Sequence, residues 1–283
     1  MRPYLRTRDL NRDASDEEFR YERCPDCGLA SLANAPADLG RYYAAGYHEI
    51  PASAEGLERG AAHDSYKIDL VRQFATRGRL VEIGPGWGAF CLLARRAGFE
   101  VEAIERDPRC CEFLQKELGV RAIRSDDPAT ALAQAATADA IVLWHVVEHL
   151  ADPWAVLEAA ARKLAPGGVL LIATPNPESF QLGLFGRFWT HVDAPRHLHL
   201  IPVRLLRSRM ARLGLDAELA TTTDPGSIGW NDFGWRFSLA NLAPHRALKR
   251  PLRLAGRVLG KLAALIDNRE GRGSAYTAVF RKR

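Results

Sequence analysis

The sequence predicts an α/β fold in which an open sheet of parallel strands carries helices on both of its faces. Apolar runs that are typical of buried strands alternate five times with helical segments from about residue 61 to residue 175. The connections between them are short, which favours parallel strands joined by right-handed crossovers. A composition of 47% hydrophobic and 26% charged residues is typical of a globular chain with a substantial core.

The strands and helices of this repeating unit can be placed in order. Proline is favoured in the first turn of a helix, so one helix should begin at Pro108. The run Pro166-Gly167-Gly168 should end the last helix before the fifth strand. The expected strands are 79–83, 99–104, 120–123, 138–144 and 169–174, and the expected helices include 65–76, 88–97 and 153–164.

The regular alternation weakens after Pro175. Residues 175–200 are rich in Pro, Gly, His and aromatic side chains, so we expect a loop region there. A helix is expected at 202–213, and strand-like runs follow at 215–222 and 275–280. The segment 224–270 between these two runs reads as an insertion.

The first sixty residues show no such alternation, so we divide the chain into an N-terminal cap, 1–60, and a main domain, 61–283. The cap holds a C-x-x-C turn at Cys24 and Cys27, which is half of a zinc site, and an aromatic cluster at Tyr42, Tyr43 and Tyr47. A structural zinc needs four ligands, but residues 1–23 contain neither Cys nor His, and only His48 and His63 could complete the set. A metal-free turn is therefore favoured over zinc.

Charge and cysteine content exclude several classes of protein. The net charge of +5 is spread along the chain, so no nucleic-acid partner is expected. Five cysteines are too few for a disulfide scaffold and fit a reducing cytoplasm. No apolar run reaches the roughly 20 residues of a membrane span, and the N-terminus lacks the apolar core of a signal peptide.

A glycine-rich turn after the first strand indicates a nucleotide-like cofactor. The turn is Glu82-Ile-Gly84-Pro-Gly86-Trp-Gly88, and Glu105 lies 21 residues after Gly84 at the end of the next strand. Glycines allow the backbone to approach a ligand, and a carboxylate at that distance can accept both ribose hydroxyls. The glycine spacing also fits a dinucleotide, which leaves an NAD(P)-dependent oxidoreductase as an alternative. Glu82 would repel a pyrophosphate but would suit a ligand with an ammonium group.

These residues resemble motif I of the class I S-adenosylmethionine-dependent methyltransferases, in their ubiquinone-biosynthesis-like and sugar-modifying branch. The similarity continues through the segment Trp144–Pro153 and the turn Leu164–Gly168, and covers about 61–223 and 274–281. It implies a Rossmann-like, doubly wound sheet of seven strands, the last of them antiparallel. It also implies that S-adenosylmethionine is held by Glu82, Gly84, Gly86, Gly88, Glu105, Asp126 or its neighbour Asp127, and Trp144.

Two histidine-rich segments should surround the reacting centre. The first, His145-Val-Val-Glu148-His149, also matches an inverted zinc-peptidase motif, but Pro153 leaves little helix to carry such a site. The resemblance places His145 beside the cofactor and points Glu148 and His149 toward the substrate cleft. A divalent cation there, or a purely structural Glu148–His149 pair, stays open.

The second segment, 190–200, holds His191 and His197, which we take as candidates for the general base, with Asp193 as their orienting partner. His199 should point to the opposite face if the segment is extended. A hydrogen-bonded network that only fixes the loop is the alternative. The expected reaction is O-methylation of a small molecule or glycan precursor. The acceptor itself, which could be a sugar, a quinone or a phenol, is not readable, and a cofactor-binding domain without catalysis is a further alternative.

A basic amphipathic helix is predicted at 250–266, after aromatic residues at Trp230, Phe233, Trp235 and Phe237. Arg and Lys side chains share one face and Leu, Val and Ile side chains share the other. The favoured interpretation is that the apolar face packs on the domain or on a second subunit. The alternative is a helix that lies on a membrane surface, so that a cytoplasmic enzyme becomes membrane-associated. The oligomeric state cannot be predicted.

Overall fold

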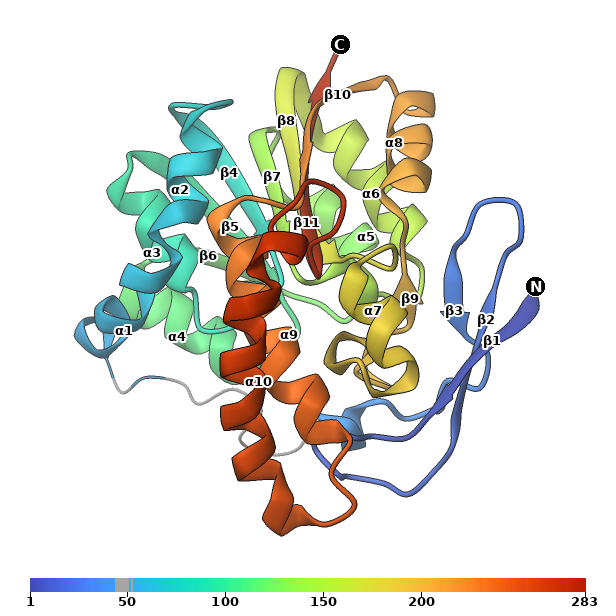
Figure 1. Ribbon diagram of the computed structural model, residues 1–283. Helices are drawn as coiled ribbons and strands as arrows, with labels where there is room; N and C mark the ends of the chain where they lie inside the picture. Colours follow the sequence, from blue (N-terminus) through green and yellow to red (C-terminus); the bar gives the residue numbers. More distant parts are fainter. Residues whose placement is uncertain (44–50, 52) are drawn as a thin grey trace.

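The computed structural model describes residues 1–43, 51 and 53–283 (Figure 1). Its centre is a seven-stranded sheet with the strand order β10-β11-β8-β7-β4-β5-β6. Strand β11 runs antiparallel to both of its neighbours, while the pairs among β4 to β8 are parallel. The fold class and the antiparallel last strand are thus confirmed. The strands are β4 (Gly78–Ile83), β5 (Phe99–Glu105), β6 (Arg121–Arg124), β7 (Ala138–Trp144), β8 (Leu164–Pro175), β10 (Leu215–Thr221) and β11 (Ala275–Lys282).

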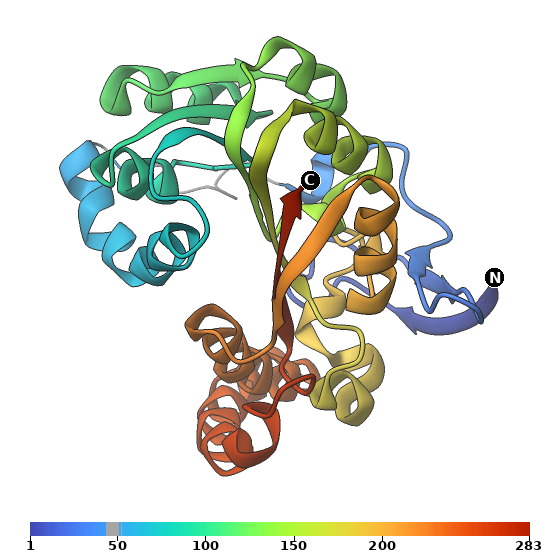
Figure 2. The same ribbon diagram turned by 90° about the horizontal axis from the view of Figure 1, so that it is seen from above.

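Helices cover both faces of this sheet (Figure 2). Alternate side chains of each strand point to opposite faces, so Val81 and Ile141 join one buried apolar cluster, while Leu80 and Val142 join the other. Helices α5, α6 and α8 complete the first cluster, and α1 to α4 complete the second. The helices are α1 (Ala54–Ala61), α2 (Ser65–Arg72), α3 (Ala89–Arg96), α4 (Pro108–Leu118), α5 (Pro128–Gln134), α6 (Pro153–Lys163), α7 (Phe180–Phe185), α8 (Val203–Arg212), α9 (Pro225–Asn241) and α10 (Arg246–Asp267).

Four of these helices begin in the same way, with an aspartate followed by a proline. The aspartate carboxylate accepts hydrogen bonds from backbone N–H groups of the first turn, and proline occupies the first helical position, where no N–H is needed. The four capping residues are Asp107 for α4, Asp127 for α5, Asp152 for α6 and Asp224 for α9. The chain therefore encodes its turns from strand to helix locally.

The N-terminal segment forms a second, smaller sheet that the sequence did not predict. Strands β1 (Arg2–Thr7), β2 (Phe19–Arg23) and β3 (Ala30–Leu32) pair in order, and β9 (His199–Leu200) adds to β3 from the histidine-rich loop. The Cys24–Cys27 turn joins β2 to β3, where the Gly28 N–H donates to the Cys24 carbonyl at 3.0 Å. Tyr47 and His48 lie outside the described residues.

The insertion before β11 consists of α9 and α10, which pack against each other (Figure 1). The predicted helix 250–266 is present but longer, and it contains Pro251. The expectation that its apolar face packs on the domain was wrong. The face that contacts α9 carries Gly256 and Gly260, while the leucines are exposed. No helix in the described part of the chain is long and apolar enough to cross a membrane.

Candidate functional site

The predicted site residues meet where β4, β5 and β7 end, because parallel neighbours place their carboxyl ends at one edge of the sheet. Gly84, Gly86 and Gly88 have φ values of +69°, +56° and +85°, a region that glycine adopts without strain. A Cβ atom on Gly84 would lie only 2.6 Å from Val146 Cγ2, in the histidine segment after β7. The glycine loop and the histidine segment are therefore in direct contact.

The carboxylate of Glu105 fixes the glycine loop from the end of β5. Its Oε2 accepts the Gly86 N–H at 3.0 Å, and its Oε1 accepts the N–H groups of Arg106 and Asp107 at 2.8 Å. The side chain is buried. It thus stands against the loop, as the ribose-binding prediction requires, and that role stays a prediction.

The two aspartates after β6 have different environments. The side chain of Asp126 is 86% exposed and lies 3.7 Å from Arg106 Nε. Asp127 caps α5, and hydrogen bonds from Thr130 hold the pKa of its carboxyl below the usual value. Because the Asp127 carboxylate is already committed to the helix, Asp126 is the better candidate for the adenine contact.

Glu82 is a buried carboxyl at the base of the glycine loop, where Cys91 Sγ donates to its Oε2 at 3.0 Å. Burial raises the pKa of Glu82 to about 7, although Cys91 and Lys67 oppose the shift. Such a carboxylate would be stabilised by a cationic ligand. Lys67 Nζ also lies 5.6 Å from the ring centre of Trp144, which packs edge-on against Phe90.

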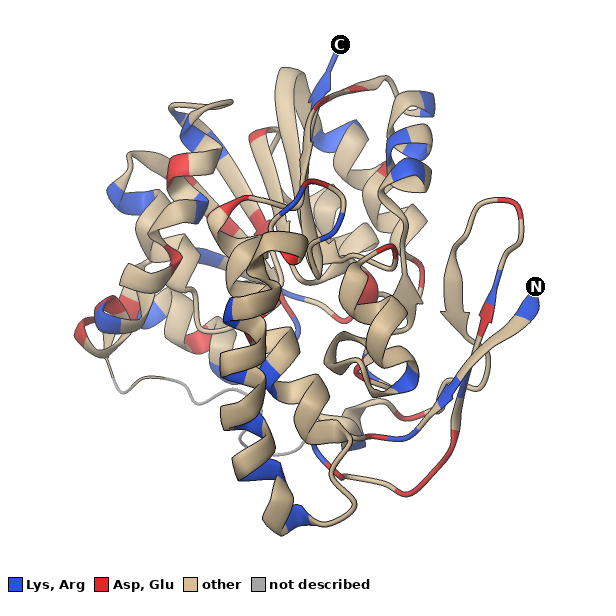
Figure 3. Ribbon diagram, viewed as in Figure 1, with Lys and Arg blue, Asp and Glu red and all other residues tan. Residues whose placement is uncertain are grey.

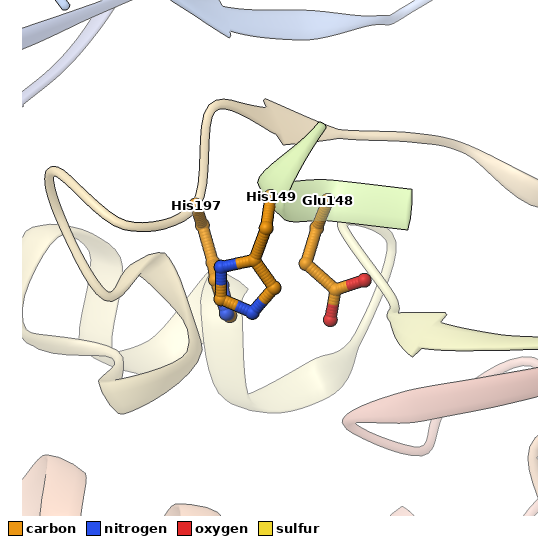
Figure 4. Close-up of side chains that lie close together, drawn as sticks. All are labelled: Glu148, His149 and His197. Atoms are coloured by element: carbon orange, nitrogen blue, oxygen red, sulfur yellow. The ribbon is translucent and has the colours of Figure 1, made fainter. Parts of the chain in front are cut away.

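Figure 4 shows Glu148, His149 and His197 close together, at the end of β7 and in the loop that precedes β9. One ligand atom from each lies within 4.8 Å of the others, and the two imidazole centroids are 4.6 Å apart. Thr174 Oγ1 donates to Glu148 Oε2 at 3.0 Å, and His145 Nδ1 lies 3.5 Å from Oε1. Burial would raise the pKa of Glu148, but the surrounding histidines lower it to about 2.

The hydrogen bonds of the two imidazoles indicate where their lone pairs point. His149 Nδ1 lies 3.0 Å from the Arg196 carbonyl oxygen, and His197 Nδ1 lies 2.8 Å from the His191 carbonyl oxygen. A carbonyl only accepts, so both Nδ1 atoms donate, and in a neutral ring the lone pair then lies on Nε2. Tyr43 Oη is also 3.0 Å from His149 Nδ1.

Two imidazoles and a carboxylate thus converge, and Glu148 Oε1 is buried without a hydrogen-bond partner among the described residues. Such a donor set can take up a proton or hold a divalent cation. Burial lowers the pKa of His149 to about 4, so this ring is neutral at physiological pH.

The other two predicted histidines lie beside the same cluster. Trp230 of α9 contacts both rings, with centroid distances of 4.5 Å to His145 and 5.4 Å to His191. His191 Nε2 donates to the Trp230 carbonyl oxygen at 3.3 Å, and burial lowers the pKa of this ring to about 3. The structure therefore brings all four predicted histidines together, while the choice of the base stays a prediction.

One interpretation from the sequence was wrong. Asp193 does not orient a histidine by a hydrogen bond, because its carboxylate pairs with Arg196 at 2.7 Å and accepts from Asn11. The peptidase motif, which the sequence already disfavoured, has no helix to carry it, because His145 has a φ of +56° and precedes the 3₁₀ turn Val147–His149. His145 and His149 therefore do not share a helix face. The third donor comes from His197 instead. His199 points away and contacts Ser31, as expected.

The cysteine turn shows no metal-binding set. Among the described residues, Glu148, His149 and His197 form the one group of three candidate ligands, and neither Cys24 nor Cys27 belongs to it. His63 lies in a 3₁₀ turn next to α2. Zinc at Cys24 and Cys27 stays a prediction that the structure does not support.

Several residues around the site were missing from the predicted set. Glu148 was placed at the cleft but not among the catalytic candidates, although it belongs to the same H-x-x-E-H pattern. Lys67 lies far from the motifs in the sequence, and no pattern marks a role for Tyr43 in the cap or for Arg196 beside His197. Their roles follow only from the tertiary contacts.

Comparison with known proteins agrees with this geometry. A model of a methyltransferase-domain family matches residues 57–219, which is more than half of the chain. The ubiquinone biosynthesis O-methyltransferase of Cereibacter sphaeroides (strain ATCC 17029 / ATH 2.4.9) is 30% identical over 172 residues, covering 57% of this chain and 68% of that protein. A protein of the same description from Xanthomonas oryzae pv. oryzae is 29% identical over 146 residues, covering 48% and 57%.

Solved structures share the fold. A SAM-dependent methyltransferase from Archaeoglobus fulgidus aligns with a TM-score of 0.52 at 19% identity, covering 78% of this chain and 94% of that one. A cyclopropane synthase from Mycobacterium tuberculosis aligns with a TM-score of 0.52 at 18% identity, covering 76% and 83%. With the glycine loop, its acidic partners and the family match in place, the chain belongs to the methyltransferase-domain family and is a class I S-adenosylmethionine-dependent methyltransferase.

Proposed function

We propose that this enzyme methylates a hydroxyl oxygen of a small-molecule or glycan-precursor acceptor, and that the cluster of Glu148, His149 and His197 takes up the hydroxyl proton. The observation that carries the proposal is the convergence of two imidazoles, each anchored through Nδ1 to a backbone carbonyl, on a buried carboxylate. The names of the relatives from C. sphaeroides and X. oryzae, both O-methyltransferases, support the same chemistry. The family membership decides against the nicotinamide-dependent alternative.

The protein's own work in this reaction is positioning and proton removal. S-adenosylmethionine, when bound, supplies a methyl group that is already activated on a sulfonium. The glycine loop and Glu105 would fix the cofactor, and the half-buried Trp230 against His145 and His191 would help to keep water from the acceptor. With the cofactor in place, its methyl group would go to the acceptor oxygen, and an imidazole of the cluster would take up the hydroxyl proton.

The same three side chains offer a donor set that fits a divalent cation, which would lower the pKa of a coordinated hydroxyl. A chelator separates the two modes of proton removal. Activity that survives extensive treatment with EDTA supports the imidazole base alone, whereas loss that is restored by added Mg²⁺, Mn²⁺ or Zn²⁺ assigns the role to a cation.

Three asparagine variants test the histidine base, assayed with radiolabelled S-adenosylmethionine against sugars, nucleotide sugars and phenols. For His149→Asn and His197→Asn we expect kcat to fall by about 10²- to 10⁴-fold, with unchanged affinity for S-adenosylhomocysteine. His199→Asn is the matched control, because His199 lies in the same loop but bonds to Ser31 outside the cluster. Full activity of both cluster variants would refute the proposed base.

A further inference from the structure

Helix α10 exposes its most apolar face. The face that packs on α9 consists of small residues, because a Cβ atom on Gly256 would lie 2.6 Å from the Trp235 carbonyl oxygen and one on Gly260 would lie 3.2 Å from Trp235 Cβ. The opposite face carries large apolar side chains with exposed fractions of 66% for Leu254, 56% for Val258, 71% for Leu262 and 80% for Leu265. A soluble helix ordinarily buries such a stripe.

The charge next to this stripe has one sign. Six Arg and Lys residues lie on α10, and its sole carboxylate, Asp267, is buried against Trp235 and Gln181 (Figure 3). Lys249 pairs with Asp13 of the cap, but Arg257 and Lys261 have no ion pair with any described residue. At 3.6 residues per turn, Arg257 and Lys261 fall along one edge of the apolar stripe.

The chemistry of this surface decides between possible partners. A second copy of the chain, docked face to face through α10, would bring two basic edges together and would offer no exposed carboxylate from the helix to neutralise them. An anionic lipid surface supplies both missing parts, an apolar layer for the leucines and phosphate headgroups for the arginines and lysines. The surface therefore complements a bilayer better than it complements itself.

A row of aromatic side chains connects this helix to the reacting centre. Trp230 contacts His145 and His191, and the ring of Phe233 lies 5.3 Å from that of Trp230. Phe237 stacks on Phe233 at 4.2 Å, and the guanidinium of Arg253 on α10 lies 4.6 Å from the Phe237 ring. The aromatic row therefore links the α9-facing side of α10, where Arg253 lies, to the histidines.

We propose that α10 is a membrane-docking helix that lies on anionic lipid surfaces, with its leucines in the interface and its basic edge on the headgroups. This inference does not depend on the acceptor or on the base. It predicts a peripheral, salt-sensitive association of the enzyme with the bilayer.

Co-sedimentation of the full-length protein with lipid vesicles tests the apolar half of the proposal. The wild type should sediment with vesicles of phosphatidylglycerol and phosphatidylcholine, and far less with phosphatidylcholine alone. The triple variant Leu254→Ser, Leu262→Ser and Leu265→Ser should stay in solution. Leu184→Ser, a leucine that is 55% exposed on α7, is the matched control and should sediment like the wild type.

A charge-reversal pair tests the electrostatic half. Arg257→Glu with Lys261→Glu should weaken binding to anionic vesicles by at least about tenfold, since each basic residue near such a surface contributes about 1 kcal/mol. Arg207→Glu with Arg212→Glu makes the same change in net charge on exposed positions of α8 and should have a much smaller effect. Thermal unfolding and titration with S-adenosylhomocysteine confirm that each variant is folded.

Three results would overturn the proposal. The first is a wild type that does not bind anionic vesicles. The second is equal binding by the α10 variants and their controls. The third is a wild type that forms a dimer in sedimentation velocity and does not bind vesicles, with a leucine variant that is monomeric. That result would assign the apolar face of α10 to a second copy of the chain.

Discussion

Backbone conformation at single residues decides whether the cofactor loop can form. Gly84 combines a positive φ with a close approach to Val146, so a side chain there meets both strain and a clash. Non-glycine residues adopt this region at a cost of roughly 1–2 kcal/mol, and the clash adds to it. The loop that Glu105 fixes would shift as a result.

We therefore predict that Gly84→Ala lowers affinity for S-adenosylhomocysteine by more than about tenfold, or about 1.4 kcal/mol, in isothermal titration calorimetry. Gly214→Ala is the control for backbone strain alone. Gly214 directly precedes β10 and has a similar φ of +75°, but a Cβ atom there would meet open space. That control should lower thermal stability and leave the affinity unchanged. Equal affinities for the wild type and the Gly84 variant would contradict the role of the loop.

At the residue scale the sequence predicted the site well where local chemistry marks it. The glycines, Glu105 and the four histidines could be named because motif spacing after successive strands places them at one edge. The role of Asp193 was misjudged, because its partner Arg196 was not singled out and Asp9 lies far away in the chain. The choice between Asp126 and Asp127 required the structure, which shows that Asp127 caps a helix.

A buried ion cluster is one of the connections between the cap and the histidine loop. Arg196 and Asp9 are both fully buried, with Nη2 2.7 Å from Oδ1, and Asp193 contacts the same guanidinium at 2.7 Å. The Arg196 carbonyl also accepts the His149 Nδ1–H. The cap sheet, through β9 and this cluster, thus holds the loop that carries His197.

Removing the guanidinium should leave two carboxylates buried without a counter-charge. We predict that Arg196→Met lowers the free energy of unfolding in urea by about 3–5 kcal/mol and also reduces kcat. Arg6→Met is the control. Arg6 on β1 pairs with Glu18 at 3.8 Å, and both side chains are exposed. Such exposed ion pairs contribute little to the free energy of unfolding. Similar stability of both variants would show that the cluster does not hold the loop.

At the scale of elements, the strands and helices could be predicted where burial leaves a clear apolar pattern in the sequence. β4, β5 and β7 were predicted to within a residue or two, because parallel central strands are continuous apolar runs. The cap strands were missed, since β1 is largely exposed and β9 is only two residues long and pairs across the chain. Helix α9 was missed because its aromatic residues point to several sides.

The whole molecule should lose stability in mild acid, because its buried histidines are neutral in the folded state. Burial lowers the pKa of His149 to about 4 and that of His191 to about 3, from 6.5. The unfolded chain therefore binds more protons below pH 6.5, and the stability that is present above this pH is lost as the pH falls toward 4. Glu82 acts in the opposite direction, since its pKa is raised from 4.5 to about 7.

The two histidines together shift further than Glu82 does, so the histidines should dominate. At about 1.4 kcal/mol per pKa unit, we predict a net decrease of the order of 2 kcal/mol in the free energy of unfolding between pH 7 and pH 5. Urea unfolding at both pH values measures it. His149→Asn should reduce the decrease and Glu82→Gln should enlarge it. A stability that rises between pH 7 and pH 5 would contradict these assignments.

One titration tests most directly the central claim that S-adenosylmethionine binds at the carboxyl ends of β4 and β5. S-adenosylhomocysteine should bind to the wild type in isothermal titration calorimetry, while NAD should not. Glu105→Ala should weaken that binding by at least about tenfold, since a charged hydrogen-bonding partner is lost. Glu112→Ala, an exposed carboxylate on α4, should leave it unchanged. Undiminished affinity of a folded Glu105→Ala variant would contradict the account.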